Sequence, residues 1–171
     1  MSKLGIAVDI GSTNIAGYVV DLDKRKDHFE LSIKNSQTKH GFDLITRLTF
    51  ASNNKNNRDI LHKLLVNDIN NLIFALCKKI RINRKRVEKI VVSGNTMMLH
   101  SFLGMDISGF SVYPYKSQIK SSLNIKSSDL GIVAGKDTRI ITMPIISPYV
   151  GADSVAGIIY TKMDEVSSLK L

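Results

Sequence analysis

Cysteine is nearly absent from this chain, since Cys77 is the only one among its 171 residues. One thiol excludes an intrachain disulfide, and it cannot build a zinc or iron–sulfur cluster within this chain. Cys77 lies in the helical pattern Phe-Ala-Leu-Cys-Lys-Lys, where we expect a small, buried, apolar residue. The low cysteine content is typical of the reducing cytoplasm, which is the location we expect.

Long apolar runs are also missing. No stretch of about 18 consecutive apolar residues occurs, so we expect no membrane span. The first residues lead directly into an expected strand, without the pattern of a signal peptide. Apolar residues make up 43% of the sequence and charged residues 23%, and the length is sufficient for one domain with a core.

Acidic residues are outnumbered, because 24 Lys and Arg face 15 Asp and Glu and give a formal net charge of +9. Such a charge permits attraction to nucleic acid or to an anionic ligand. The densest cationic group lies between residues 78 and 86, where an expected helix end meets a loop and cations complement the helix dipole. No aromatic stacking pattern accompanies it. We therefore interpret it as a solvated surface and expect no nucleic-acid partner.

The N-terminal region contains a hairpin with the composition of a phosphate site. A strand over residues 3–10 carries Asp9 near its end, and a second strand covers 15–22. The turn between them consists of Gly11, Ser12, Thr13 and Asn14. Glycine lets backbone amides approach an anion closely, and successive N–H groups and hydroxyls donate to its oxygens. Asp9 is suited to hold Mg²⁺ through water. The same residue types also form ordinary turns, so both interpretations remain.

The rest of the pattern predicts alternating strands and helices. Strands are expected at 3–10, 15–22, 28–34, 87–93 and 138–143, and helices at 58–80, 94–104 and 152–163. Three antiparallel strands followed by βαβα crossovers predict an α/β fold with a five-stranded mixed sheet and helices on its faces. Residues 105–137 are expected to be irregular.

The polar stretch over residues 35–57 is expected to contain one or two helical turns between Gly41 and Phe50. Asp43 and Arg47 are four residues apart within it, a spacing that favours a local ion pair. Such a pair contributes little to stability if it is exposed.

A second candidate anion site follows the strand at 87–93. Gly94, Asn95 and Thr96 open a helix there, and helix N-termini bind anions readily. The alternative is that Asn95 or Thr96 only caps the helix. His100 lies one turn later, and we expect a packed or surface residue and not a ligand.

Three strings occur in a fixed order, namely Asp9-Ile-Gly-Ser-Thr13, Val91–His100 and Pro144–Asp153. Together they resemble the first ribonuclease-H-like subdomain of the acetate and sugar kinase/chaperone/actin superfamily. Within it, the chain is most similar to the ATPase domain of reductive activators of corrinoid proteins, and Asn35–Arg47 is a further matching string. Those activators use ATP to help return an oxidised cobalt centre to its reduced state. The resemblance covers nearly the whole chain.

The resemblance implies roles for specific residues. Asp9 corresponds to the metal-side aspartate, and the turn 11–14 to the donors for the β- and γ-phosphates. Relatives often carry Thr where this chain has Ser12 and Asn14, but both residues keep a hydrogen-bond donor. Asp153 corresponds to the aspartate that positions the nucleophile, which in an ATPase is water attacking the γ-phosphoryl group. The alternative for Asp153 is an ordinary carboxylate favoured by the dipole at a helix start.

The resemblance also implies parts that this sequence does not contain. Related ATPases close two subdomains around one nucleotide, and the activators carry an iron–sulfur domain. Residues 1–171 are therefore expected to form a single ribonuclease-H-like subdomain, the first half of an actin-like ATPase domain. Expected partners are a corrinoid protein, a complementary chain with the second half, or a second copy, and expected cofactors are ATP and Mg²⁺. The alternative is a non-catalytic protein-interaction module that keeps the fold without ATPase activity.

Overall fold

The computed structural model describes residues 3–24, 26–110, 113–115, 117–119 and 121–163. The strands are β1 (Leu4–Ile10), β2 (Asn14–Asp21), β3 (Lys26–Lys34), β4 (Val87–Gly94), β5 (Asn124–Lys126) and β6 (Arg139–Thr142). The α-helices are α1 (Leu44–Ser52), α2 (Lys55–Lys79), α3 (Thr96–Phe102) and α4 (Ala152–Thr161). The 3₁₀ turns are η1 (Ser36–His40), η2 (Arg84–Arg86), η3 (Ser108–Phe110) and η4 (Ser127–Leu130).

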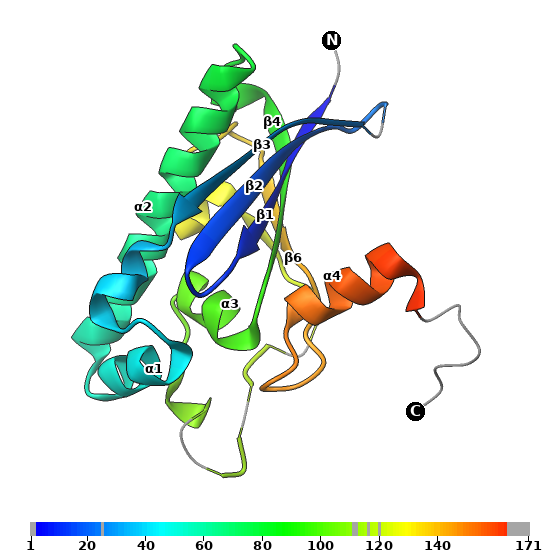
Figure 1. The fold of residues 1–171 in the computed structure, drawn as a ribbon. Helices are drawn as coiled ribbons and strands as arrows, with labels where there is room; N and C mark the ends of the chain where they lie inside the picture. Colours follow the sequence, from blue (N-terminus) through cyan, green and yellow to red (C-terminus); the bar gives the residue numbers. More distant parts are fainter. Residues whose placement is uncertain (1–2, 25, 111–112, 116, 120, 164–171) are drawn as a thin grey trace.

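The strands form one mixed sheet in the order β3-β2-β1-β4-β6-β5 (Figure 1). β1, β2 and β3 are joined by antiparallel pairing, whereas β1, β4 and β6 run parallel. The α/β class and the mixed sheet are thus confirmed. The expected count of five strands is wrong, because the described sheet also contains β5, antiparallel to β6. β5 has three residues in a Ser- and Lys-rich stretch, too short to produce an alternating pattern.

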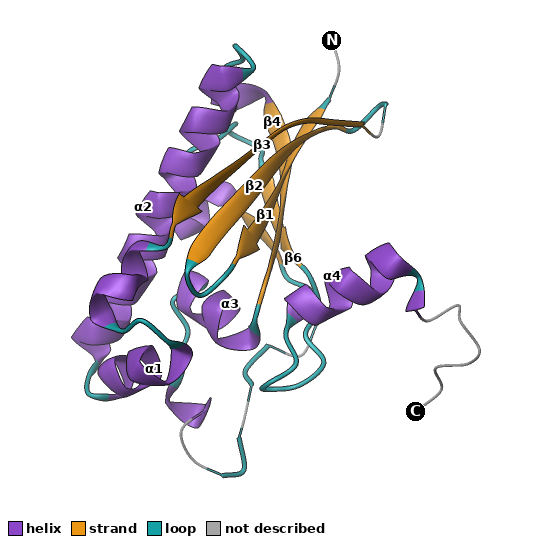
Figure 2. Cartoon of the chain, in the orientation of Figure 1, coloured by secondary structure: helices purple, strands orange, loops and turns teal. Residues whose placement is uncertain are grey.

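The long helix α2 packs along one face of the sheet (Figure 2). Its buried side chains recur every three or four residues and include Leu61, Leu65, Ile69, Leu72, Ile73 and Leu76. Gly17 of β2 makes the close approach possible, since a Cβ there would lie 2.9 Å from side-chain carbons of Leu72 and Leu76. Cys77 is buried in this interface, as expected.

Helix α2 also has the length and apolar composition of a membrane-spanning helix, a test that the core helix of a globular domain passes as well. Its buried side belongs to the hydrophobic core beside β1 and β2. Asp68 on the same helix accepts hydrogen bonds from the backbone N–H and the hydroxyl of Ser36. We therefore interpret α2 as a core helix.

The starts of the helices follow from capping side chains. Asn54 accepts a hydrogen bond from the N–H of Asn57 at 2.9 Å, and α2 begins at Lys55, three residues before the expected start. Asp43 caps α1 in the same way through the N–H of Thr46. Helix α1 packs against α2 (Figure 1), and its Arg47 side chain reaches the turn that follows β1.

Candidate functional site

Three chain segments meet at one edge of the sheet. Because β1, β4 and β6 are parallel, their carboxyl ends lie on the same side, and Ile10 is paired with Gly94. The turn 11–14 follows β1, the start of α3 follows β4, and the loop to α4 follows β6. Ligands of open α/β sheets bind outside the carboxyl ends of the strands. The sequence-predicted site residues are thus brought to one edge.

Glycines allow these segments to touch. A Cβ on Gly151 would lie 2.5 Å from the Cα of Asn95, and a Cβ on Gly94 would lie 2.8 Å from the carbonyl oxygen of Ile10. Gly94 also has φ of 154°, which favours glycine. Within the turn, a Cβ on Gly11 would lie 2.6 Å from the Asn14 carbonyl oxygen. A larger residue at any of these positions requires the backbone to shift.

Three carbonyl groups of the turn are held by Asn35 and Arg47. The Gly11 carbonyl accepts from Asn35 Nδ2 at 2.9 Å, and the Thr13 carbonyl accepts from the Asn35 N–H at 2.8 Å. Between them, the Ser12 carbonyl accepts from Arg47 Nη2. In a trans peptide the N–H points opposite to the preceding C=O. The N–H groups of Ser12 and Thr13 therefore face away from Asn35, and neither donates a hydrogen bond to another described residue. This leaves two adjacent donors for an anion.

Two carboxylates from distant parts of the chain face the same region. Asp9 lies near the end of β1 and is exposed, and Asp153 lies in the first turn of α4. The pKa of Asp9 is raised, first because neighbouring protein atoms shield it in part from water and second because of the negative charge of Asp153. Asp153 also accepts from the N–H of Ser154 at 2.7 Å, which orients its carboxylate. A cation between the two carboxylates would relieve their repulsion.

The donor set fits magnesium bound together with a phosphate. The described residues contain no group of three or more His, Cys, Asp or Glu side chains that could hold a metal alone. Mg²⁺ prefers one or two carboxylates completed by water and phosphate oxygens. Asp9 beside two free N–H groups and the hydroxyls of Ser12 and Thr13 provides such an environment.

Ser93 is a neighbour of this site that the sequence did not indicate. It is paired with Asp9 in the register of β1 and β4, so both side chains lie on the same face of the sheet. Its Oγ is buried and has no hydrogen-bond partner among the described residues. A buried hydroxyl of this kind is available to water or to a ligand. Only the strand register places it there, and the register is not visible in the sequence.

Asn95 and Thr96 use their side chains inside the protein. Asn95 Oδ1 accepts from the N–H of Met98 at 2.9 Å and caps α3, and Thr96 Oγ1 donates to the Ser147 carbonyl at 2.9 Å. The capping interpretation is thus confirmed, and contact of this segment with phosphate stays a prediction. His100 is a packed residue, as expected. Its Nδ1 lies 2.7 Å from the Thr96 carbonyl oxygen, and burial lowers its pKa.

The prediction of a local ion pair between Asp43 and Arg47 is wrong. Asp43 is exposed and caps α1, whereas the Arg47 side chain is 0% exposed and points toward the turn 11–14. The signal for a buried arginine was present, because Arg47 shares one helical face with Leu44, Leu48 and Ala51. Asn35 was likewise missed as a support of the turn.

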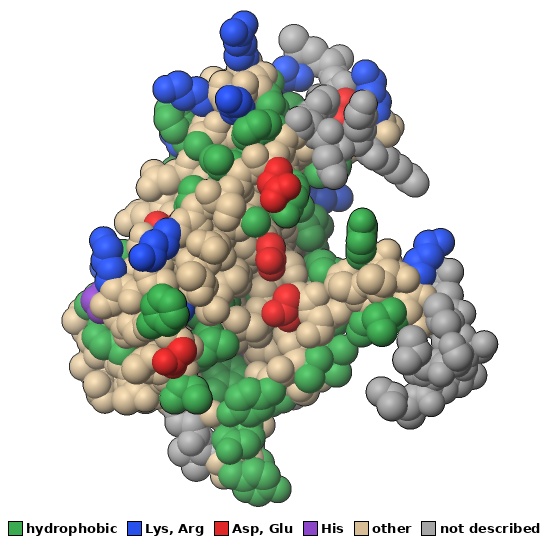
Figure 3. All heavy atoms as spheres, viewed as in Figure 1, with side chains coloured by type: hydrophobic (Ala, Val, Ile, Leu, Met, Phe, Trp, Pro, Cys, Tyr) green, Lys and Arg blue, Asp and Glu red, His purple; other side chains and the backbone are tan. Residues whose placement is uncertain are grey.

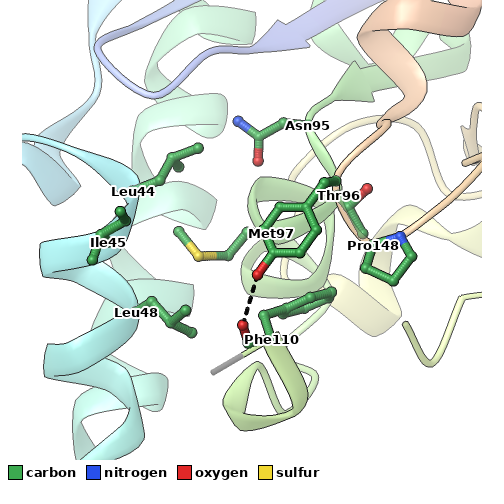
Figure 4. Close-up of a pocket in the computed structure, with 9 residues that line it drawn as sticks. Leu44, Ile45, Leu48, Asn95, Thr96, Met97, Phe110 and Pro148 are labelled. Atoms are coloured by element: carbon green, nitrogen blue, oxygen red, sulfur yellow. Dashed lines mark hydrogen bonds between the residues drawn. The ribbon is translucent and has the colours of Figure 1, made fainter. Parts of the chain in front are cut away.

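An apolar hollow lies next to the start of α3 (Figure 4). Leu44, Ile45 and Leu48 of α1 line one side of it, and Met97 and Pro148 lie across from them. Such a lining does not suit the phosphate groups themselves. It does place apolar surface beside Asn95 and Thr96.

Comparison with known proteins identifies the family. The family model described as the RACo middle region matches residues 4–166. The corrinoid activation enzyme RamQ of Eubacterium limosum is 26% identical over 167 residues, which cover 98% of this chain and 28% of RamQ. A solved structure of a reductive activator for a corrinoid, iron–sulfur protein matches with a TM-score of 0.93 and 30% identity, over 97% of this chain and 26% of that one. This chain thus spans little more than a quarter of the length of these relatives. Because the family model covers nearly all of its residues, the protein belongs to the RACo middle region family.

Proposed function

We propose that this chain forms the first phosphate-binding half of an ATP-dependent activator of corrinoid proteins. The similarity to RamQ and to the reductive activator supports the role in corrinoid activation. The turn 11–14 supports the nucleotide role, because its carbonyls are tied to Asn35 and Arg47 while the N–H groups of Ser12 and Thr13 are left to an anion. This last observation is the main support for the proposal.

In this proposal some residues of the chain bind the phosphates and Mg²⁺, and another orients the attacking water. The N–H and hydroxyl groups of the turn 11–14 hold the β- and γ-phosphates, together with the backbone at residues 94–96. Asp9 would hold Mg²⁺ through water, and the bound ion would supply positive charge beside the phosphates. Asp153 orients the attacking water. These are contributions of position and charge, which dominate phosphoryl transfer.

We expect a second subdomain to complete the proposed site. Charge stabilisation in phosphoryl transfer comes from groups around the phosphate chain. A complementary ATPase half, or a second copy of this chain, would supply the missing side. We therefore expect weak nucleotide binding by residues 1–171 alone, and hydrolysis only in a complex. The proposed partner is a corrinoid protein, and the proposed location is the cytoplasm.

Isothermal titration of Mg-ATP into the wild-type chain and into Asp9→Ala tests the nucleotide role. We expect weak binding by the wild type and a loss of roughly tenfold in the variant, the size of one charge-assisted interaction. Asp137→Ala is the matched control, since Asp137 is an exposed aspartate in the turn before β6, at the opposite edge of the sheet. Equal affinity of the wild type and Asp9→Ala would contradict the role of Asp9.

A non-catalytic interaction module is the second candidate function. The exposed apolar side chains support it, because Tyr160 of α4 is 90% exposed and Ile45 of α1 is 77% exposed. Such side chains are typical of a protein contact. This alternative predicts a stable protein complex that Mg-ATP does not change. A complex that forms or dissociates with nucleotide would favour the activator.

A further inference from the structure

Arg47 is the largest fully buried side chain in the described part of the protein. Its Nε donates to the Gly41 carbonyl at 2.9 Å, and its Nη2 donates to the carbonyls of Phe42 and Ser12. Its Nη1 lies 3.4 Å from Gln37 Oε1. All these acceptors are neutral, and among the described residues no carboxylate is hydrogen-bonded to the guanidinium. A buried cation without a paired anion is costly.

Holding α1 in place does not require this charge. The Gly41, Phe42 and Ser12 carbonyls need N–H donors, but a neutral donor group would satisfy them without the cost of burying a charge. Burial in fact disfavours the charged form and lowers the pKa of Arg47, and the Asp43 carboxylate at the start of α1 opposes this only in part. The position of the charge therefore calls for an explanation other than packing.

The guanidinium lies directly behind the turn 11–14. It contacts the inner side of the Ser12 peptide, and the N–H groups of Ser12 and Thr13 face the outer side. Asn35 holds the two neighbouring carbonyls from the same inner side. The positive charge and the peptide dipoles thus both favour an anion on the outer face of the turn.

We propose that Arg47 is a positioning residue for phosphate binding, because it fixes the Ser12 carbonyl on the inner side of the turn and places a permanent positive charge behind the bound anion. This inference rests on the proposed nucleotide role of the turn. A bound phosphate supplies the counter-charge that the interior lacks. Phosphate affinity and the contacts of Arg47 are then coupled.

Arg47→Lys and Arg47→Met separate this role from packing. Lysine keeps a cation and a donor, whereas methionine keeps much of the volume without charge. We expect both variants to be less stable than the wild type, because each loses hydrogen bonds to the Gly41, Phe42 and Ser12 carbonyls, and the Met variant to bind inorganic triphosphate and Mg-ATP roughly tenfold more weakly than the Lys variant. A purely structural arginine predicts that affinity follows stability. Affinity of Arg47→Met equal to that of the wild type would overturn the proposal.

Thr138→Val is the control for stability loss without a change near the turn. It removes the hydrogen bond from Thr138 Oγ1 to the Val87 carbonyl, at the opposite edge of the sheet. We expect lower stability with triphosphate affinity within twofold of wild type, twofold being about 0.4 kcal/mol. A large affinity loss in this control would show that any destabilisation weakens binding and would count against Arg47.

A measurement on the wild type keeps the test valid if the variants do not fold. In a ¹⁵N-labelled sample, the Arg47 Nε–H signal and the amides of Ser12 and Thr13 are followed during titration with inorganic triphosphate. Shifts of all three with one dissociation constant support the coupling. Amide shifts with an unchanged Arg47 signal overturn it while the proposed function stands. Unchanged wild-type amides overturn the proposed function itself, and this inference with it.

Discussion

At the scale of single residues, Asp9 is held in an environment that disfavours its charge. Partial shielding from water and the negative charge of Asp153 both raise its pKa, in that order of importance. In the chain without a cation, the ionised carboxylate therefore opposes folding. Groups with perturbed pKa values are frequent at functional sites. The ionised carboxylate that opposes folding is the form that binds a cation. Stability and Mg-ATP binding should thus respond to Asp9 in opposite directions.

Asp9→Asn tests this opposition through the pH dependence of stability. With a folded-state pKa above the ordinary value of 3.8, the folded chain keeps a proton that the unfolded chain has released. Stability therefore falls as the pH rises through this window, and the contribution of Asp9 is most favourable below it. We expect Asp9→Asn to be more stable than the wild type at pH 7, by less than about 1 kcal/mol because the site is exposed.

The measurement is urea unfolding of both proteins at pH 7 and near pH 3. The difference in unfolding free energy should shrink in acid, where Asp9 is protonated in both states. The same variant should bind Mg-ATP more weakly than the wild type. A variant that is less stable than the wild type at pH 7 would refute the unfavourable environment of Asp9.

At the scale of elements, the seating of α4 depends on one glycine. Gly151 is the N-cap of α4 and lies against the backbone of Asn95 and Thr96, at the start of α3. The hydrogen bond from Thr96 Oγ1 to the Ser147 carbonyl joins the same two segments. This contact sets where α4 begins and hence where Asp153 is placed.

Gly151→Ala and Gly157→Ala are expected to have opposite effects, although both place alanine in or at the same helix. The Cβ at residue 151 would lie 2.5 Å from the Asn95 Cα, so we expect a loss of about 1–3 kcal/mol. The Cβ at residue 157 would meet nothing within 4 Å, so the better helix propensity of alanine should add about 0.5–1 kcal/mol. Denaturant midpoints measure both, and equal effects would contradict the close seating of α4.

The sequence was a good guide to elements whose pattern is local. The apolar spacing along α2 and the strand before Asp9 predicted both elements, and the caps then adjusted their ends by a few residues. β5 was missed because its pairing with β6 is a long-range property. The prediction for Arg47 was wrong because the spacing of Asp43 and Arg47 indicates only that they can pair on the surface of a helix. The guanidinium instead lies inside the protein and donates to the Ser12 carbonyl in the turn 11–14.

At the scale of the whole molecule, the exposed apolar side chains are unevenly distributed. Lys and Arg side chains gather at the end of α2 that is remote from the turn 11–14, whereas hydrophobic side chains are exposed around α1 and α4 (Figure 3). Phe42 and Ile45 are 72% and 77% exposed, and Ile159 and Tyr160 are 60% and 90% exposed. Exposed apolar side chains of this kind are typical of protein contact surfaces, so α1 and α4 are the elements to test for one.

The double substitution Ile159→Ser and Tyr160→Ser tests whether α4 provides contact surface. We expect reduced concentration-dependent self-association in sedimentation velocity and less binding of an apolar dye, with the melting temperature within about 2 °C of wild type because both side chains are exposed. Phe74→Ser is the control, since Phe74 is 56% exposed on α2, away from this side. An equal effect of the control would indicate general stickiness and no specific surface on α4.

The contact between Arg47 and Ser12 joins a surface helix to the turn after β1. A partner that binds α1 therefore contacts the helix that carries Arg47, whose guanidinium donates to the Ser12 carbonyl. If occupancy of the turn changes the affinity of such a partner, thermodynamic linkage requires the partner to change nucleotide affinity by the same factor. A protein bound at α1 and a nucleotide bound at the turn would then change each other's affinity without any residue common to both binding sites.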